Sequence, residues 1–423
     1  MKKKLQSITG MNDILPNQIQ YWQKLESTAK KIMANYGFAE IRTPILEETQ
    51  LFSRGIGDGS QVVQKEMYSF DDKGGDSVTM RPEGTAGVMR SYLQHSLSAS
   101  DAITKLYYMG PMYRYERPQK GRYRQFHQIG AETIGIDSAL ADAEVVIMLD
   151  RIFKAVGVKE FELEINSLGT LEERKPYLEK LQEYFTPFKK ELCEDCQIRF
   201  VKNPLRILDC KNKFCKDKSV DAPTMLDVLT DETREEFETF KTALTKANVP
   251  FKINAKIVRG LDYYEKTAFE FISSELGSQS TFCGGGRYNR LAQELGAKNP
   301  VPAVGFSIGC ERTILIMQAL ESKTAQEPKL NGLYLAGMDQ AGYEVCQNIM
   351  QTLRDAGIKA EMDYTVKSLK SQLRRGNKLG FKYVAISGEN ERAKSVVMLK
   401  DFSNGEQEEV KVDNLLGYLQ ENL

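Results

Sequence analysis

The spacing of strand-like segments is the strongest constraint on the fold of this chain. Runs of apolar or alternating residues that are typical of strands are separated by turns, hairpin-like loops and long insertions. They cover residues 78–81, 105–114, 125–134, 161–166, 255–258, 268–272 and 303–308. Regularly alternating helices, which accompany a parallel sheet, do not separate them. We therefore predict an α+β fold whose first domain is a mainly antiparallel sheet with helices attached.

Two further segments near the amino terminus complete this domain. Residues 18–36 carry apolar side chains at helical spacing and stop at Gly37, which predicts an amphipathic helix. Residues 39–46 alternate but contain Pro44, which favours a strand at a sheet edge or at a subunit boundary.

The remainder of the chain divides into a helical module and an α/β domain. Residues 172–249 have a charged helical pattern and interrupt the strands. The polar segment 322–328 ends in proline, as a domain linker does. Beyond it, strand-like and helical segments alternate, which predicts a compact α/β domain. The strands are expected at 333–336, 360–362 and 383–387, and the helices at 342–355 and 367–379.

Composition excludes several classes of protein. The 423 residues include 58 lysines and arginines and 58 aspartates and glutamates, so only local patches can bind a polyanion. The longest stretch without a charged residue, 299–310, is far shorter than the roughly 20 residues of a membrane-spanning helix. No apolar segment of a secretory signal follows the first lysines. We expect a cytoplasmic protein without membrane contact, whose seven cysteines are reduced thiols.

A basic hairpin is the first candidate for a functional site. Residues 106–125 contain five basic residues, one acid and five tyrosines. Arg114 can point at a phosphate, with Glu116 orienting it or contacting a base. A solvated hairpin with its tyrosines packed on one face explains the same pattern about equally well.

Three more clusters carry residues suited to a ligand. In 258–264, an arginine leaves a strand next to two tyrosines. The glycines of 283–288 would let a ligand approach bare backbone, although such a run is more often a tight connection. In 303–312, a strand passes through glycine into a helix, and Arg312 in its first turns suits a terminal phosphate.

These clusters together resemble the class II aminoacyl-tRNA synthetases, and within them the histidyl-tRNA synthetase family. The resemblance covers nearly the whole chain. The three class motifs look present at 41–44, at 113–116 through 126–128, and at 309–312. Segments 259–264 and 284–288 resemble the two signatures that distinguish the histidine enzymes from other class II members. Threonine and proline enzymes of the class are disfavoured by segment 259–264.

The resemblance implies the domain organisation. Residues 1–168 and 257–325 are expected to form the class II catalytic domain. Residues 169–256 are expected to form a helical insertion domain, and residues 330–423 an α/β anticodon-binding domain. The basic residues between 366 and 383 are a plausible tRNA-backbone face, although a charge run is more often a solvated surface. A homodimer is expected because the first class motif, with Pro44, builds the subunit interface in this family.

The resemblance also implies the reaction and its residues. The expected substrates are L-histidine, ATP with Mg²⁺, and the tRNA specific for histidine. The histidine carboxylate can attack the α-phosphate without a protein base, so the protein must supply positive charge. Arg259 and Arg114 are the expected catalytic residues. The expected ATP-binding residues are Arg114, Glu116, Arg122 and Arg312, and the expected histidine-binding residues are Glu83, Gly84, Thr85, Gln128, Glu132, Tyr263 and Tyr264.

Two alternatives to this interpretation would need different residues. A regulatory paralogue that senses histidine would typically lack the phosphate-binding arginines and the last domain, and both are present here. A plain tRNA-binding protein would not need the amino-acid pocket. Without the resemblance, Glu83 would be read as part of a surface turn.

Four cysteines lie within the helical insertion. Cys193, Cys196, Cys210 and Cys215 are spaced loosely like the ligands of a zinc ribbon. The gaps of thirteen and four residues depart from the usual pairs, so the sequence favours ordinary reduced cysteines, and no metal ligand is assigned.

Overall fold

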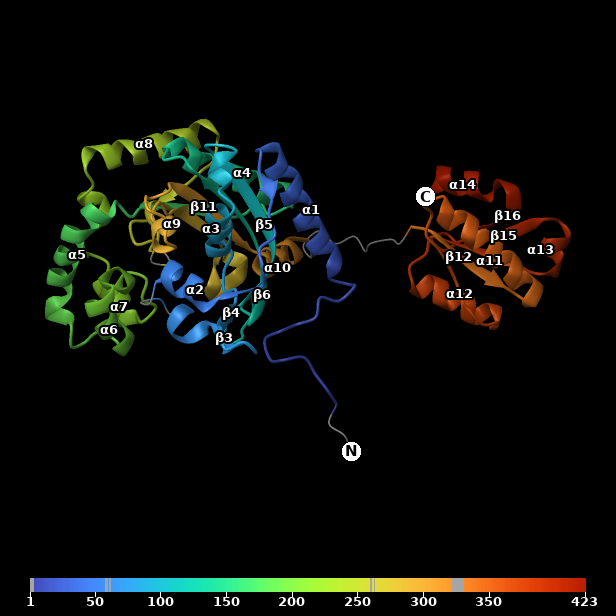
Figure 1. Ribbon diagram of the computed structural model, residues 1–423. Coiled ribbons are helices and arrows are strands. Elements are labelled where there is room, and N and C mark those ends of the chain that lie inside the picture. The colour runs from blue at the N-terminus through green and yellow to red at the C-terminus, as the bar shows by residue number, and fades with distance from the viewer. Residues whose placement is uncertain (1–3, 58–59, 61, 259–260, 262, 322–330) are drawn as a thin grey trace. The chain divides into compact units, whose positions relative to one another are not determined.

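The chain folds into two units (Figure 1). The computed structural model describes residues 4–57, 60, 62–258, 261, 263–321 and 331–423. One unit comprises Met1–Thr324 and the other Ala325–Leu423. The predicted linker 322–328 lies outside the described residues. Among the described helices, none has both the length and the apolar character required to cross a membrane.

An eight-stranded sheet organises the first unit. Its order is β1-β5-β6-β11-β10-β9-β7-β8. The strands are β1 (Ala39–Glu40), β5 (Thr104–Tyr113), β6 (Gln125–Ile134), β7 (Glu162–Ser167), β8 (Lys252–Ile253), β9 (Glu265–Ile272), β10 (Thr281–Arg287) and β11 (Ala303–Gly309). All neighbouring pairs are antiparallel except β1–β5 and β7–β8 at the two edges. The predicted α+β class with an antiparallel sheet is therefore confirmed.

The glycine run is part of a central strand, which corrects the prediction of a tight connection. A Cβ atom at Gly285 would lie 2.1 Å from the carbonyl oxygen of Gly305, and one at Gly286 would lie 2.4 Å from that of Thr267. Only glycine fits where the neighbouring strands come this close. The lack of side chains concealed the strand pattern in the sequence.

Two other strand predictions require correction. Residues 255–258 form no strand, because β8 ends at Ile253 and the chain turns, with the amide of Ile257 donating to Asn254. Residues 39–46 contribute only β1 and the first residue of β2 (Leu46–Glu48). Pro44 lies in the gap between them, where its missing N–H group cannot extend a ladder. Strand β2 pairs instead with β4 (Ser77–Met80), which also pairs with β3 (Tyr68–Asp71).

Helices cover the eight-stranded sheet and create the main core. They include α1 (Ile19–Asn35), α4 (Ala139–Ala155), α8 (Asp231–Lys246) and α10 (Cys310–Glu321). Their apolar side chains, among them Leu25, Phe153 and Phe240, pack with Phe269 and Phe306 of the sheet. A buried ion pair joins sheet and helix: Arg287 of β10 lies 2.6 Å from the Asp142 carboxylate of α4.

The insertion adds a smaller core of its own. Helices α5 (Leu171–Phe185), α6 (Glu194–Lys202) and α7 (Lys213–Lys218) gather at one side of the unit (Figure 1). Thr170 caps α5 through a reciprocal hydrogen-bond pair with Glu173. Tyr177, Leu181 and Phe185 of α5 are buried against the cysteines.

The second unit is the predicted α/β domain. Its sheet has the order β13-β12-β14-β15-β16, with the first three strands parallel and the last two added antiparallel. The strands are β12 (Leu333–Gly337), β13 (Ala360–Met362), β14 (Tyr383–Ser387), β15 (Val396–Asp401) and β16 (Gln407–Lys411). The helices include α11 (Gln340–Asp355), α12 (Leu369–Lys378) and α14 (Leu415–Asn422). Strands β15 and β16 were not predicted from the sequence.

Candidate active site

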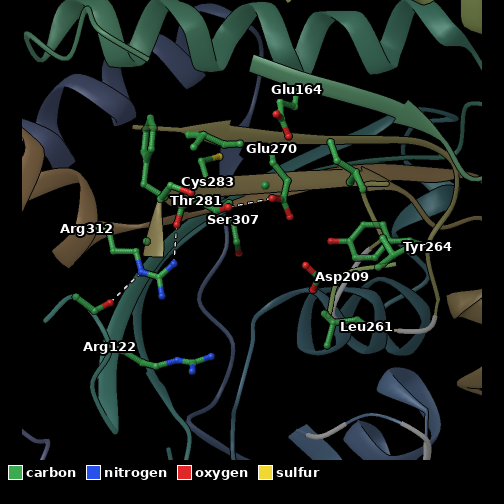
Figure 2. A pocket seen from close by; sticks show the side chains of 18 of the residues that line it. Arg122, Glu164, Asp209, Leu261, Tyr264, Glu270, Thr281, Cys283, Ser307 and Arg312 are labelled. Carbon is green, nitrogen blue, oxygen red and sulfur yellow. Dashed lines mark hydrogen bonds between the residues drawn. The ribbon is translucent and has the colours of Figure 1, made fainter. Parts of the chain in front are cut away.

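A large cavity opens on the face of the eight-stranded sheet that bears the glycines. Its volume is about 830 Å³. Residues of β6, β7, β9, β10 and β11 contribute to it, together with the loop that precedes α7 (Figure 2). Most of the residues predicted for the site lie on its wall: Glu83, Thr85, Arg114, Glu116, Arg122, Gln128, Tyr263, Tyr264 and Arg312. Gly84 and Glu132 lie behind this wall, and Arg259 is outside the described residues.

Glu83 is buried at the start of a helix rather than exposed in a surface turn. Its carboxylate accepts hydrogen bonds from the backbone amides of Thr85, at 2.6 Å, and Ala86, at 2.8 Å, in the first turn of α3 (Thr85–Gln94). Burial raises the pKa of Glu83, while these amides oppose the shift. Next to it, Gly84 leaves room for the ring of Tyr108, which a Cβ atom would approach to 2.2 Å. The turn that carries Glu83 is therefore part of the cavity wall and not of the exposed surface.

Glu132 forms the centre of a buried hydrogen-bond network. It accepts hydrogen bonds from the hydroxyl of Thr85, at 2.8 Å, and from the hydroxyl of Tyr288. Burial raises the pKa of Glu132 to about 8, although these two hydrogen bonds oppose the shift. Gly305 makes the arrangement possible, because a Cβ atom there would lie 1.6 Å from the carboxylate. Tyr288 was not predicted as a site residue, although it ends the glycine-rich segment singled out in the sequence.

Aromatic and amide groups line the same end of the cavity. The ring of Tyr263 lies 4.7 Å from that of Tyr264 and 5.5 Å from that of Tyr288. The Tyr263 hydroxyl and the side-chain amide oxygen of Gln128 are buried without a hydrogen-bond partner among the described residues. A buried polar atom without a partner costs free energy, so a polar ligand that pairs with these atoms would be favoured. This end of the cavity suits a small polar ring.

The opposite end of the cavity is positively charged. Arg114 donates to the carbonyl oxygen of Pro82 at 2.9 Å, and its guanidinium lies 5.2 Å from the Phe126 ring centre. Arg122 forms an ion pair with Glu116, whose carboxylate lies 4.0 Å from Arg114. One carboxylate thus faces two guanidinium groups.

Arg312 adds a third guanidinium from the first turn of α10. It donates to the carbonyl oxygens of Gly121, at 2.9 Å, and Thr281, at 2.5 Å. Figure 2 shows Arg312 and Arg122 on one side of the cavity and Tyr264 on the other. Burial and the neighbouring Arg122 lower the pKa of Arg312. Close cations of this kind favour a polyanion such as a triphosphate.

Several cavity residues were not predicted from the sequence. Glu270 of β9 accepts a hydrogen bond from Thr281 at 2.9 Å, and Asp209 approaches from the insertion (Figure 2). Burial raises the pKa of Asp209. The signal for Glu270 was its position in a predicted strand, but that signal does not distinguish the two faces of the sheet. No local pattern placed Asp209 at this cavity.

Two family models match the chain. A family model described as histidyl-tRNA synthetase matches residues 10–173 and 215–313, and one described as anticodon binding domain matches residues 332–422. The chain is 46% identical over 411 residues to a histidine–tRNA ligase of Syntrophotalea carbinolica, which covers 97% of each chain. It is 44% identical over 419 residues to one of Geobacillus sp., which covers 98% of each chain.

Solved structures show the same relationship. The crystal structure of apo S. aureus histidyl-tRNA synthetase matches with a TM-score of 0.82 and 34% identity, over 99% of this chain and 100% of that chain. A Bacillus halodurans structure described as an ATP phosphoribosyltransferase regulatory subunit/histidyl-tRNA synthetase shares the fold. Its TM-score is 0.67 at 18% identity, over 92% of this chain and 100% of that chain.

The raised pKa of Glu132 predicts a pH-dependent stability. An unfolded glutamate titrates near pH 4.3, whereas folded Glu132 retains its proton up to a pKa of about 8. Between these values the unfolded chain binds fewer protons, so this residue makes the free energy of unfolding fall as pH rises. When thermal unfolding is measured at pH 5.5 and pH 8.5, the decrease in stability between the two pH values should be smaller for E132Q than for the parent protein. The exposed Glu179→Gln is the control, and an equal loss in all three proteins would contradict the assignment.

Proposed function

Because the chain belongs to the histidyl-tRNA synthetase family, we propose that this cavity activates L-histidine with ATP for transfer to the tRNA specific for histidine. The enzyme is a histidine–tRNA ligase: histidine, ATP and tRNA give histidyl-tRNA, AMP and diphosphate. The observation that supports the proposal for the cavity is its division into an arginine-lined end and an end lined by tyrosine and amide groups.

The first step needs electrostatic help rather than a base. The histidine carboxylate is ionised at pH 7 and attacks the α-phosphorus. The bond from the α-phosphorus to the oxygen that bridges it to the β-phosphate breaks, and diphosphate leaves with that oxygen and the electron pair. Negative charge builds on the phosphoryl oxygens during this displacement. Fixed cations stabilise that charge best in a site with little water, because they need not reorganise.

We assign the cations by their positions and by the family motifs. Arg114 contacts the α-phosphate. Its hydrogen bond to the carbonyl oxygen of Pro82 holds the guanidinium next to the segment that carries Glu83. Arg312 and Arg122 contact the outer phosphates from the same positively charged end of the cavity. Arg259 contacts the transferring centre, by resemblance alone. Glu116 orients Arg122 and Arg114, since its carboxylate faces both.

The histidine would occupy the opposite end. Glu83, Thr85 and Gln128 surround the α-ammonium group, and Tyr263 and Tyr264 face the imidazole. Glu132 lies one hydrogen bond behind Thr85, so its contact with the ring requires the imidazole to replace the Thr85 hydroxyl at that carboxylate. Amino acids without ring nitrogens would leave these buried groups unpaired, a difference worth about 10⁴ in selectivity.

Magnesium would enter with the nucleotide. Mg²⁺ is usually held by substrate phosphates, water and one or two carboxylates. Glu270 on the cavity wall offers a carboxylate of this type. The ion would neutralise part of the phosphate charge, while the arginines keep the phosphates in place.

The second unit would bind the tRNA through α12. Lys370, Arg374 and Lys378 are exposed on or beside this helix. Other basic residues of the segment are engaged within the unit: Lys367 and Arg375 lie 3.0 and 2.7 Å from the Asp363 carboxylate. The first three residues are therefore the phosphate contacts that we propose.

A cytoplasmic homodimer is the assembly we propose. Ile45, Leu46 and Phe70 are 42%, 47% and 49% exposed on or beside the small β2–β4–β3 sheet. Exposed apolar groups gathered on one element are typical of an interface. Pro44 of the first class motif immediately precedes them.

The proposed activation step predicts ATP–diphosphate exchange with histidine alone among the twenty amino acids. The tyrosine and carboxylate end should reject the others by about 10⁴. Exchange measured with each amino acid in turn tests the prediction. Exchange with a different amino acid would overturn the pocket assignment, and histidine binding without exchange would favour a regulatory role.

Two arginine variants should separate binding from catalysis. Arg312→Ala removes a charged contact to ATP, so KM for ATP should rise by about tenfold or more. Arg259→Ala should leave ATP binding largely intact and lower kcat by roughly 10². The exposed Lys159→Ala is the control, and steady-state exchange kinetics provide both constants. If Arg259→Ala changed kcat by less than about threefold, the proposal that Arg259 stabilises the transition state would be wrong.

The α12 surface should matter for tRNA only. The triple variant K370A/R374A/K378A should raise KM for tRNA and reduce the slope of log affinity against log salt by about 2, since each phosphate contact contributes roughly 0.7. Histidine-dependent exchange should not change. The exposed Lys411→Ala is the control in the same unit. An unchanged salt dependence of aminoacylation would refute the assignment.

A further inference from the structure

The four cysteines of the insertion meet at one point. Cys193 and Cys196 flank the start of α6, Cys210 precedes α7, and Cys215 lies within it. Their sulfur atoms all lie within 4.8 Å of one another, and those of Cys193 and Cys210 are 3.7 Å apart. The sulfur atoms of residues up to 22 positions apart in the chain thus surround a space of about the size of one metal ion.

The spacing of the sulfur atoms fits metal coordination. Zn²⁺ binds thiolates at about 2.3 Å in a tetrahedron, which places neighbouring sulfur atoms about 3.8 Å apart. A disulfide requires about 2.05 Å between its sulfur atoms. The 3.7 Å between Cys193 and Cys210 agrees with a shared metal and not with a disulfide.

Hydrogen-bond donors point at the sulfur atoms of the cluster. The amide of Cys193 donates to the sulfur of Cys215 at 3.3 Å, and the amide of Asn212 donates to that of Cys210 at 3.4 Å. The guanidinium of Arg199 lies 4.0 Å from the sulfur of Cys196. Such outer hydrogen bonds orient metal ligands and offset their excess negative charge.

The size of the module supplies a reason for a metal. Helices α6 and α7 have nine and six residues, too short to be stable without tertiary support. Their core, shared with α5, includes three of the cysteines. Small units of this kind often replace missing apolar burial with a structural ion.

We propose that Cys193, Cys196, Cys210 and Cys215 bind one structural Zn²⁺. Four protein ligands leave no open position, so the ion stabilises structure and takes no part in the reaction. Its effect on the enzyme is positional: Asp209, Cys210 and Lys211 line the active-site cavity, so the ion secures the segment that forms this wall. The metal site stands independently of the function proposed above.

The metal content of the full-length protein tests the proposal. Protein purified from zinc-supplemented cells without chelator should contain about one equivalent of zinc by mass spectrometry. After dialysis against a chelator, Cys193→Ala should retain less than about a tenth of an equivalent. Cys346→Ala, at a buried cysteine in the second unit, should retain zinc like the parent. Zinc below about a tenth of an equivalent in the parent protein, or iron in its place, would overturn the proposal.

A second measurement covers the case in which the variant fails to fold. Unmodified protein stripped of metal and titrated with Co²⁺ should develop the visible bands of tetrahedral cobalt thiolate, and Zn²⁺ should abolish them. The absence of such bands would overturn the site. Limited proteolysis tests the positional role: stripped protein should be cleaved faster between residues 203 and 216, and zinc should restore protection. Equal cleavage with and without metal would overturn that role.

Discussion

The close approach of backbone and side chains across the glycine-bearing strands is the constraint on which the site depends. Gly305 leaves the space that the Glu132 carboxylate occupies, and Gly84 and Gly130 accept the two sides of the Tyr108 ring. A side chain at any of these positions would meet atoms at 2.2 Å or less. The buried carboxylate and the Tyr108 ring therefore fit behind the cavity because glycine occupies these positions.

The two ends of the cavity differ in how their polar groups are satisfied. At the buried end, Glu132 is held by hydroxyl groups, and burial raises its pKa to about 8. At the other end, Arg114 and Arg312 donate hydrogen bonds to backbone carbonyl groups, and Arg122 pairs with Glu116. One carboxylate does not neutralise three guanidinium groups, so this end keeps an excess of positive charge. A zwitterionic amino acid and a triphosphate have complementary requirements, which is the basis of the proposal that one cavity binds both.

The sequence was most informative where a residue acts through its own chemistry. The arginine in the first turn of α10 and the two strands of the β5–β6 hairpin were predicted with nearly the observed boundaries. The predictions of strands were wrong where a strand consists largely of glycine, or where contacts with distant residues determine the local structure. The glycines of β10 concealed a central strand, and segment 255–258 had a strand composition but turns after β8. Asp209 had no local signal and the cysteine spacing gave only a loose one, because both positions depend on how the insertion folds back.

The sequence by itself determined the antiparallel α+β class, the α/β domain at the carboxy terminus and the family, because these depend on periodicity and on motifs that are local in the chain. Only the tertiary structure decided that Glu83 is a buried helix cap, that Glu132 lies behind Thr85, and that four thiols share one point. The physical reason is that burial, pKa and coordination geometry are set by neighbours distant in sequence, and those neighbours are defined only when the sheet and the insertion have packed.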